Sequence, residues 1–516
     1  MLRSFRRLSI GALAGACLVV LGASVALRAQ IAGRNVNMVS GTEWPGGDPF
    51  LQRQNEPSIA ASTRNPLHLV AGSNDYRSVD VPGLPDGAET GDAWISVYKS
   101  FDGGQRWSST LMPGYPQDTS AAGLASPIKG YQAGADPVVR AGTHGLIYYN
   151  GLVFNRGDNG RSAIFLARFI DRNNKENGDP IAYLGTSIVA SSDGSTFLDK
   201  PWMAVDLPRG NAGFCRVGVD PAAVGDDDDD DDHHGRGGKV KRNGHRNRGR
   251  GGDRRRKNQP PDDGYQYVPA GAVYVAYTSI TGDGPTLESQ IFVKRSIDCG
   301  LTWSAPMRVT STADRINQGA TLAISPATGD LFVAWRRFST STAPNTDAVM
   351  VARLRTNGSA FEAPGRAWGM RGTGPSDDVV EKIFEPRRRR ATPTAAATVA
   401  QIDQSTSPFR FRTNAYPAMA VDGAGRAYIA WSERGYATQR PDPLTGDARI
   451  RVATTLDGRT FSAPIVVDDD PQRAGHQLMP SLAFSKGRLL VVFYDLRETR
   501  AQAFGTYVDD QTTSTG

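Results

Sequence analysis

The chain has 516 residues, of which 22% are charged, and its formal net charge at pH 7 is +6. The positive excess is concentrated in two places, because four arginines lie within the first 28 residues and four more form the run Arg387–Arg390. The rest of the sequence is close to neutral, which excludes the charge balance as evidence for nucleic-acid binding. The 3 cysteines, one of them in the N-terminal segment, are too few for a disulfide framework.

The N-terminus has the pattern of an export signal. Arg3, Arg6 and Arg7 precede an apolar run over residues 8–27, and Ala29 follows as a small residue suited to cleavage. This pattern predicts a signal peptide over residues 1–29 and an exported protein, either secreted or periplasmic. The apolar run is 20 residues long, so a membrane anchor over residues 8–27 is the alternative.

A short turn motif recurs four times along the chain. Each copy has a Ser or Thr, an Asp two residues later, a Gly soon after it and an aromatic residue at the end. The copies are Ser100–Trp107, Ser191–Phe197, Ser296–Trp303 and Thr455–Phe461. We expect the carboxylate to accept from backbone N–H groups of the turn and the glycine to adopt positive φ. We call these segments the Asp-turns, and their spacing indicates a repeat architecture.

A longer unit of four strands surrounds the motif and occurs six times. Each first strand is short and apolar, the second is rich in aromatic residues, and the third leads into the turn. The first strands begin near Pro57, Pro137, Pro201, Ala320, Pro417 and Pro480. Six such units predict an all-β fold, a six-bladed β-propeller over residues 35–510. A strand over residues 35–39 is expected to complete the last blade, with the Asp-turns on one face.

Two insertions interrupt the predicted blades. Residues 207–265 carry the run Asp226–Asp232 followed by His233, His234 and an Arg-, Lys- and Gly-rich stretch, and residues 372–408 are rich in Arg, Ala, Thr and Pro. Both have too few apolar residues to favour a packed structure, so we expect them to be disordered. The acidic run lacks defined ligand spacing, so a solvated segment is favoured over a calcium or zinc site. No metal site and no cofactor are expected.

The two remaining cysteines fall in the same predicted unit. Cys215 lies between the first and second strands of the third unit, and Cys299 lies in the Asp-turn of that unit. Both connections emerge on one face of a propeller, which is compatible with a disulfide. Two free buried thiols are the alternative.

The face opposite the Asp-turns is the predicted ligand site. Loops that enter the first strands and leave the second strands meet there, and they offer Glu56, Asp136, Asp199, Lys200 and Gln318 among many polar residues. One interpretation is ion pairing between blades. The other is recognition of an anionic or polyhydroxylated ligand, because arginine binds carboxylates in a bidentate fork. The candidate ligand-binding residues are Arg53, Arg336, Arg337, Arg412, Asp495 and Arg497.

The Asp-turns and the strands Glu56-Pro-Ser-Ile-Ala60 and Asp199-Lys-Pro-Trp-Met-Ala204 resemble the sialidase superfamily, in particular exported bacterial proteins with BNR (Asp-box) repeats. The resemblance implies a sialidase-like propeller and an exo-glycosidase that releases sialic-acid-type sugars from glycoconjugates. It also implies Asp75 as acid/base, Tyr416 as nucleophile and Glu433 as its partner, with Arg336, Arg337 and Arg412 holding the substrate carboxylate.

This sequence has Asn55-Glu56-Pro57 where the family has Arg-Ile-Pro. The alternative is therefore a non-catalytic propeller that binds carbohydrate or protein at the cell surface. In both cases the expected partner is a glycan or another anionic ligand. No nucleic acid is expected, and a membrane is involved only through an uncleaved N-terminal segment.

Overall fold

The structure is a computed structural model of the whole chain. It describes residues 36, 38, 55–75, 93–157, 160–174, 178–210, 213–219, 265–282, 286–339, 347–356, 358–370, 415–438, 447–468 and 475–495. The chain divides into two compact units, residues 1–38 and residues 39–516. Every helix and strand described below belongs to the second unit.

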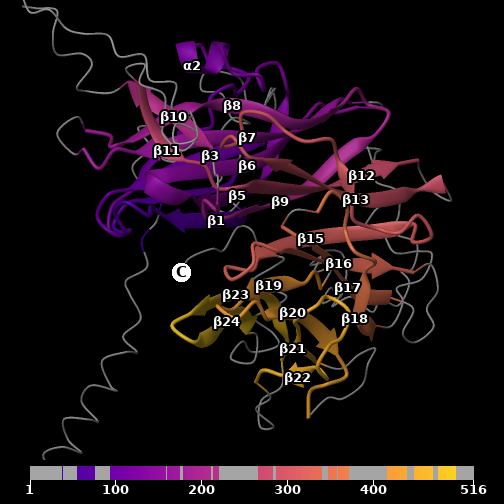
Figure 1. The fold of residues 1–516 in the computed structure, drawn as a ribbon. Helices are drawn as coiled ribbons and strands as arrows, with labels where there is room; N and C mark the ends of the chain where they lie inside the picture. The colour runs from indigo at the N-terminus through magenta and orange to yellow at the C-terminus, as the bar shows by residue number, and fades with distance from the viewer. Residues whose placement is uncertain are drawn as a thin grey trace, which may run out of the picture. The chain divides into compact units, whose positions relative to one another are not determined.

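The described residues form antiparallel sheets of up to four consecutive strands, and two such sets are joined (Figure 1). The first sheet has the strands β1 (Asn55–Ala61), β2 (Leu69–Asp75), β3 (Trp94–Ser100) and β4 (Ser108–Leu111). The second has β5 (Ala133–Ala141), β6 (Leu146–Phe154), β7 (Ser162–Asp171) and β8 (Ile181–Ser192).

An eight-stranded sheet follows, and it consists of two four-stranded sets. The third set is β9 (Phe197–Val205), β12 (Val273–Thr281), β13 (Glu288–Ser296) and β14 (Met307–Arg308). The fourth set is β15 (Ile316–Ile324), β16 (Leu331–Phe338), β17 (Asp347–Leu354) and β18 (Gly365–Met370). A single parallel pairing, of Ser289 with Ile316, joins the two sets.

The last two sheets come from the C-terminal part. The fifth has β19 (Ala418–Val421), β20 (Ala427–Arg434), β21 (Ala448–Thr455) and β22 (Ile465–Val466). The sixth has β23 (Gln477–Ser485) and β24 (Arg488–Asp495). In the described part of the chain, the helical segments are α2 (Ala121–Leu124) and the short 3₁₀ helix η3 (Thr143–Gly145). The all-β prediction is therefore confirmed.

The six predicted pairs of first and second strands are all present. Successive first strands contact one another along the series β1, β5, β9, β15, β19 and β23. Each pair of successive sheets also shares one cluster of buried apolar side chains. This packing of four-stranded sheets, one against the next, is typical of propeller blades. The count of six complete blades and the closure of the ring remain predictions.

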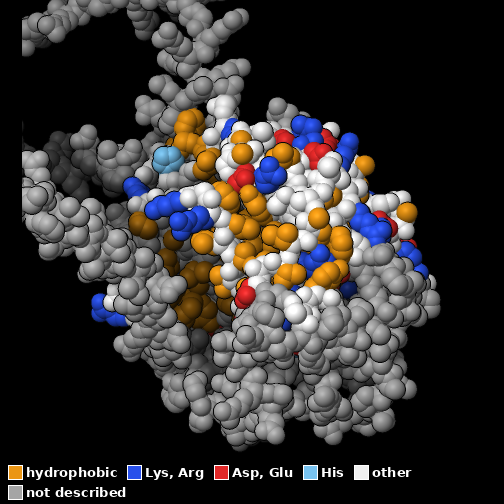
Figure 2. All heavy atoms as spheres, turned by 90° about the horizontal axis from the view of Figure 1, so that it is seen from below, with side chains coloured by type: hydrophobic (Ala, Val, Ile, Leu, Met, Phe, Trp, Pro, Cys, Tyr) orange, Lys and Arg blue, Asp and Glu red, His pale blue; other side chains and the backbone are white. Residues whose placement is uncertain are grey.

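The surface of the first and last sheets leaves apolar side chains exposed. Ile59 on β1 is 55% exposed, and Val492 on β24 is 70% exposed. Figure 2 shows one face of the molecule, where hydrophobic side chains form a band among groups of Lys and Arg. The segment expected to complete the last blade, residues 35–39, lies outside the described strands. Among the described residues, no helix is long and apolar enough to cross a membrane, and the predicted signal segment 1–29 was not described.

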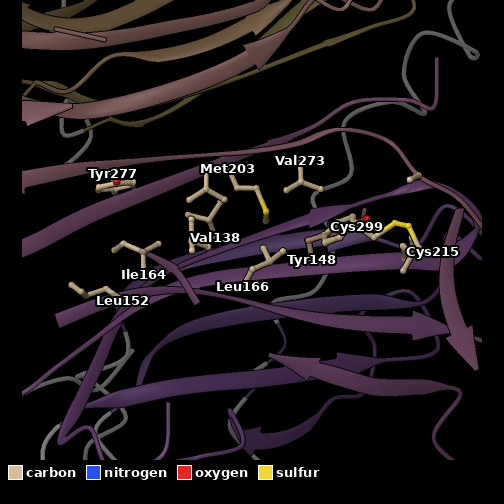
Figure 3. Close-up of a cluster of buried hydrophobic side chains, with 14 of the residues drawn as sticks. Val138, Tyr148, Leu152, Ile164, Leu166, Met203, Cys215, Val273, Tyr277 and Cys299 are labelled. Carbon is tan, nitrogen blue, oxygen red and sulfur yellow. A yellow bond between two sulfur atoms is a disulfide. The ribbon is translucent and has the colours of Figure 1, made fainter. Parts of the chain in front are cut away.

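The described parts of the predicted insertion 207–265 include a strand near each of its ends. These strands, β10 (Phe214–Val219) and β11 (Tyr265–Pro269), form an antiparallel pair. Cys215, on β10, is joined to Cys299 by a disulfide with a Cα–Cα distance of 5.9 Å. The bridge lies beside Tyr148 and Leu166 in the core between the second and third sheets (Figure 3). Residues 220–264 and the second predicted insertion, 372–408, lie outside the described residues.

The disulfide closes a loop with a sequence separation of 84 residues. In the chain-entropy model a loop of this length stabilises the folded state by about 4.6 kcal/mol. We predict that the double variant Cys215→Ser/Cys299→Ser loses up to that amount of unfolding free energy, measured by urea denaturation. Reductant should destabilise the wild type and leave the variant unchanged. Equal sensitivity of both proteins to reductant would contradict this assignment.

Three Asp-turns have the predicted hydrogen bonds. Asp102 accepts from the backbone N–H groups of Gln105 and Arg106, at 2.9 Å each. Asp298 and Asp457 accept in the same way from two N–H groups within their own turns. The Ser or Thr two residues before each Asp accepts from the N–H of a glycine with positive φ. These three turns each connect a third strand to a fourth strand.

The second Asp-turn lies at the other end of its sheet, so the expectation that all four share one face is wrong. Ser191–Phe197 follows the fourth strand, β8, and leads into β9. Ser192 pairs with Ser162 at the start of β7, whereas the other turns lie where a second strand starts. Its hydrogen bonds differ too, because Ser192, directly before the Asp, accepts from the N–H groups of Gly194 and Thr196.

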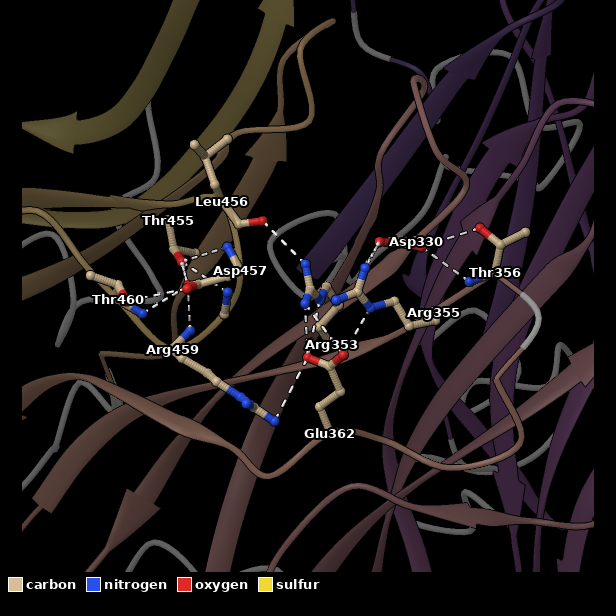
Figure 4. A network of polar contacts seen from close by, with 11 residues as sticks. Asp330, Arg353, Arg355, Thr356, Glu362, Thr455, Leu456, Asp457, Arg459 and Thr460 are labelled. Carbon is tan, nitrogen blue, oxygen red and sulfur yellow. Dashed lines mark hydrogen bonds and ion pairs between the residues drawn. The ribbon is translucent and has the colours of Figure 1, made fainter.

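The fourth unit has no Asp in its turn and uses ion pairs instead. Glu362 binds Arg353 at 2.9 Å and Arg355 at 2.8 Å, and Arg353 donates to the carbonyl of Leu456 in the neighbouring Asp-turn (Figure 4). Asp330 accepts from the backbone N–H of Thr356. This network connects the turn regions of the fourth and fifth sheets where the carboxylate of the motif is missing.

The Asp-turns make stability depend on acid pH. The backbone N–H of Arg106 lowers the pKa of Asp102 to about 2, and the backbone N–H of Thr460 lowers the pKa of Asp457 to about 2. Both values lie below the ordinary 3.8, so these groups stabilise the folded state fully above about pH 4 and lose that contribution as pH falls towards 2.

We predict that Asp102→Asn/Asp457→Asn weakens this acid dependence. The difference in unfolding free energy between wild type and variant should be constant above about pH 5 and shrink between about pH 4 and pH 2. Urea denaturation at a series of pH values measures it, and subtraction removes the effect of the other carboxylates. A difference that stays constant down to pH 2 would contradict the assignment.

Candidate functional site

The first strands share one irregularity. In five of the six, a β-bulge or register shift separates the start of the strand from its remainder. The residue at each bulge has positive φ, and the equivalent part of the fifth unit has Ala415 with positive φ. These residues are Glu56, Asp136, Lys200, Gly319, Ala415 and Met479, with φ from 45° to 68°. We call the sheet ends where these bulges lie the bulge face.

Positive φ costs a non-glycine residue about 1–3 kcal/mol, and such strain is often found at functional sites. Three of the bulge residues are charged and meet one another. Lys200 Nζ lies 2.6 Å from Glu56 Oε1 and 3.0 Å from Asp136 Oδ1, so one ammonium bridges the first, second and third sheets. Together with Asp199, which precedes Lys200, these residues form what we call the carboxylate–lysine cluster.

Asn74, at the end of β2, orients the cluster. Its side-chain amide donates to Glu56 Oε2 at 3.2 Å and to Asn55 Oδ1 at 2.7 Å, and its oxygen accepts from the backbone N–H of Asp136 at 2.8 Å. The carboxyl group of Asp136 is close enough to those of Glu56 and Asp199 for the three to affect one another's pKa values.

Their environments move the pKa values in opposite directions. Burial raises the pKa of Asp136 well above its usual value, and the negative charge of Glu56 adds to this effect. Burial also raises the pKa of Asp199. At Glu56, burial is outweighed by the hydrogen bond with Asp136 and the charge of Lys200, which lower its pKa to about 2. These surroundings favour the ionised form of Glu56 and the protonated form of Asp136.

The members of the cluster also differ in solvent exposure. The side chains of Glu56 and Lys200 are 43% and 31% exposed, whereas Asp136 and Asp199 are buried. Water screens the exposed ion pair, so burial acts mainly on the two aspartates. Three carboxyl groups also raise the pKa of Lys200 above its usual value, against the effect of burial, so the lysine is charged.

Several buried polar atoms beside the bulges have no hydrogen-bond partner among the described residues. They are Asp199 Oδ2, Thr278 Oγ1, Asn150 Oδ1 and Gln318 Nε2. Asp199 and Thr278 are cross-strand neighbours on β9 and β12, and Gln318 lies on β15, which contacts β9. Buried polar groups normally have a partner, so these atoms predict ordered water or a polar ligand at the bulge face.

The three residues proposed for catalysis come from the first and fifth units. Asp75 ends β2 in the first sheet, is fully buried, and accepts from the Tyr98 hydroxyl at 3.4 Å. The Tyr416 hydroxyl donates to Gln318 Oε1 at 2.6 Å. The Tyr416 ring lies over Gly319, where a Cβ would come within 2.2 Å of it, so only glycine fits beneath the ring.

Glu433, on β20, is surrounded by structural partners. It accepts from the indole N–H groups of Trp431 at 3.0 Å and Trp368 at 3.2 Å, and from Arg451 at 3.2 Å. The Arg451 guanidinium in turn lies over the rings of Trp368 and Tyr436. Burial raises the pKa of Glu433 even though these donors favour its anion.

The proposed arginine clamp is only partly described. Arg336 is fully buried and pairs with Asp347 at 2.8 Å, and Arg337 pairs with Asp314 at 3.4 Å. In the strand register, Arg336 lies opposite Gln318, which brings this arginine and Tyr416 to one part of the bulge face. Asp495 ends β24 opposite Gln477. Arg53, Arg412 and Arg497 lie outside the described residues.

The carboxylate–lysine cluster was not singled out from the sequence, although its members were placed on the correct face. A signal was present, because Glu56, Asp136 and Lys200 each directly precede the proline of a first strand. A residue before proline is disfavoured in the right-handed helical region. Three charged residues at this one position in successive units could have been recognised as neighbours.

We predict that Glu433→Gln acts mainly on stability. The amide cannot pair with the Arg451 charge and replaces one acceptor oxygen with a donor, so unfolding free energy should fall by about 1–3 kcal/mol. Thermal and urea denaturation measure this loss. A variant of wild-type stability would contradict the structural role and favour a catalytic one.

No family model and no curated protein matches the chain. Solved structures show a low similarity over most of its length. A protein of unknown function from Dyadobacter fermentans is 13% identical, with 86% of this chain and 90% of that chain covered and a TM-score of 0.37. A Hadza microbial sialidase is 14% identical, with 86% and 63% covered and a TM-score of 0.35. The GH93 alpha-L-arabinofuranosidase of Fusarium graminearum is 12% identical, with 86% and 88% covered and a TM-score of 0.39.

Proposed function

We propose that this chain is an exported, sialidase-like six-bladed β-propeller that hydrolyses glycosidic bonds at its bulge face. The observation that carries the proposal is the meeting of the Glu56 and Asp136 carboxyl groups at the Lys200 ammonium on the bulge face. Their surroundings also shift the two pKa values in opposite directions. Glycoside hydrolysis needs one protonated carboxyl group as acid and one carboxylate as nucleophile or base. Neighbouring carboxyl groups with separated pKa values suit this division of roles.

In this proposal the proton of Asp136 passes to the leaving-group oxygen as the glycosidic bond breaks. In one version the Glu56 carboxylate attacks the anomeric carbon and forms a glycosyl ester, which water then hydrolyses while Asp136 takes the proton of that water. In the other version Glu56 removes a proton from a water that attacks the anomeric carbon directly. Asn74 and Lys200 act as positioning residues, because they fix the two oxygens of Glu56. The charge of the buried Asp199 raises the pKa of Asp136 and so favours its protonated form.

The specific sialidase version assigns these roles to Asp75, Tyr416 and Glu433. It is supported by the family resemblance of the strands and turns. In the structure, Tyr416 lies on the bulge face beside Gln318, while Asp75 is fully buried and Glu433 binds two indoles and an arginine. We therefore propose the carboxylate–lysine cluster, and not this triad, as the reacting group.

A non-catalytic glycan-binding propeller is the second candidate, and one observation favours it. Lys200 Nζ sits between Glu56 and Asp136 at 2.6 and 3.0 Å, so a substrate has to displace or share this ammonium before it reaches both carboxyl groups. A protein that only binds glycans needs no such rearrangement.

We predict that Asp136→Asn lowers kcat on hydrolysed glycosides by roughly 10²–10⁴-fold, because the amide cannot donate the proton. A panel of fluorogenic glycosides, including a sialoside and an arabinofuranoside, identifies the substrate and measures the loss. Asp179→Asn is the matched control, since Asp179 pairs with Lys99 and is 51% exposed. It should keep wild-type activity, and thermal melting should show that both variants fold.

Unchanged turnover in Asp136→Asn would overturn the catalytic role of the cluster. No turnover by the wild type on any glycoside, together with binding on a glycan array, would favour the non-catalytic candidate. Loss of turnover in Tyr416→Phe with normal turnover in Asp136→Asn would restore the sialidase assignment.

A further inference from the structure

The charge on the bulge face limits which glycans fit there. The carboxylate–lysine cluster holds three carboxyl groups and one ammonium, and that ammonium already contacts two of the three. A sugar that carries its own carboxylate would come close to the Glu56 carboxylate. The charge of Lys200 would not attract this sugar, because Glu56 already neutralises it. Like charges at this range repel each other, and water reduces the repulsion only in part, because the Glu56 side chain is 43% exposed.

Three described arginines in this part of the fold do not offer a replacement. Arg336 is fully buried with Asp347, and withdrawing it towards a ligand would leave a buried carboxylate without its partner. Arg337 is engaged with Asp314, and Arg451 is engaged with Glu433. The guanidinium groups of these three are therefore already paired with protein carboxylates.

The buried polar atoms beside the cluster favour hydroxyl groups. Asp199 Oδ2 is an acceptor, Gln318 Nε2 is a donor and Thr278 Oγ1 can be either, and none of the three has a partner among the described residues. Asp199 and Gln318 are more than nine-tenths buried. A sugar hydroxyl, or a water that it binds, can both donate and accept, so it can satisfy carboxyl and amide groups together.

We infer that the bulge face selects neutral glycans and discriminates against glycans that end in a carboxylate sugar. This rests on the proposed function and states its substrate class. Glu56 sets the discrimination, since it is the carboxylate that neutralises Lys200 and is also the most exposed member of the cluster. Removing its charge would free the ammonium to face an incoming sugar acid.

The test compares two glycans that differ only in a terminal sialic acid. A glycan array with neutral and sialylated oligosaccharides identifies the best neutral ligand, and calorimetric titration with the full chain gives Kd for that ligand and its sialylated form. We expect the neutral form to bind at least about tenfold more tightly. We expect Glu56→Gln to reduce this ratio roughly tenfold, through tighter binding of the sialylated form.

Asp179→Asn again supplies the control. It also removes one negative charge that pairs with a lysine, but it lies just before β8, at the sheet end opposite the bulge face. Its ratio of affinities should stay within about twofold of wild type, because exposed charges at a distance are screened.

Tighter binding of sialylated glycans by the wild type would overturn the inference and leave the proposed function standing. An unchanged ratio in Glu56→Gln would overturn the role of Glu56 in selection. Binding to no glycan of either kind would instead overturn the proposed function, and the inference with it.

Discussion

The backbone at the bulge of each first strand is the constraint on which the site depends. A residue with positive φ interrupts the pairing of five first strands, and Ala415 takes the same conformation in the fifth unit. The bulge turns one side chain out of the alternation of the strand. Because successive first strands are in contact, the charged side chains of Glu56, Asp136 and Lys200 meet across three sheets. The strained backbone conformations of the first strands therefore all lie at the bulge face.

Much of the fold could be predicted from the sequence. The six pairs of first and second strands follow from their apolar and aromatic patterns, which burial in packed sheets requires. The Asp-turns were identified from residue types that satisfy their own backbone groups, and three of them have those hydrogen bonds. The prediction for the second Asp-turn was wrong because the same residue pattern also suits the connection between two sheets. The sequence does not specify whether a third or a fourth strand precedes the turn.

The site was harder to predict because its groups depend on contacts between sheets. Glu433 stands at the end of a second strand like a candidate base, yet two indoles and Arg451 reach it from β18, β20 and β21. Asp75 is likewise hidden by its neighbours in the first sheet. The role of Lys200 depends on the contact of three first strands, because its ammonium bridges Glu56 on β1 and Asp136 on β5. The residues that each side chain contacts, and not its residue type, distinguish the structural groups from the candidate reacting groups.

The Cys215–Cys299 bridge has a consequence for the integrity of the chain. Cys215 lies before the charged segment 220–264, and Cys299 lies after it. A protease that cleaves at one of the many Arg and Lys residues of that segment would therefore yield two polypeptides still held together by a covalent bond. The nicked protein would migrate as a single species until it is reduced. The bridge would thus let the protein tolerate a cut in this segment wherever the disulfide is maintained.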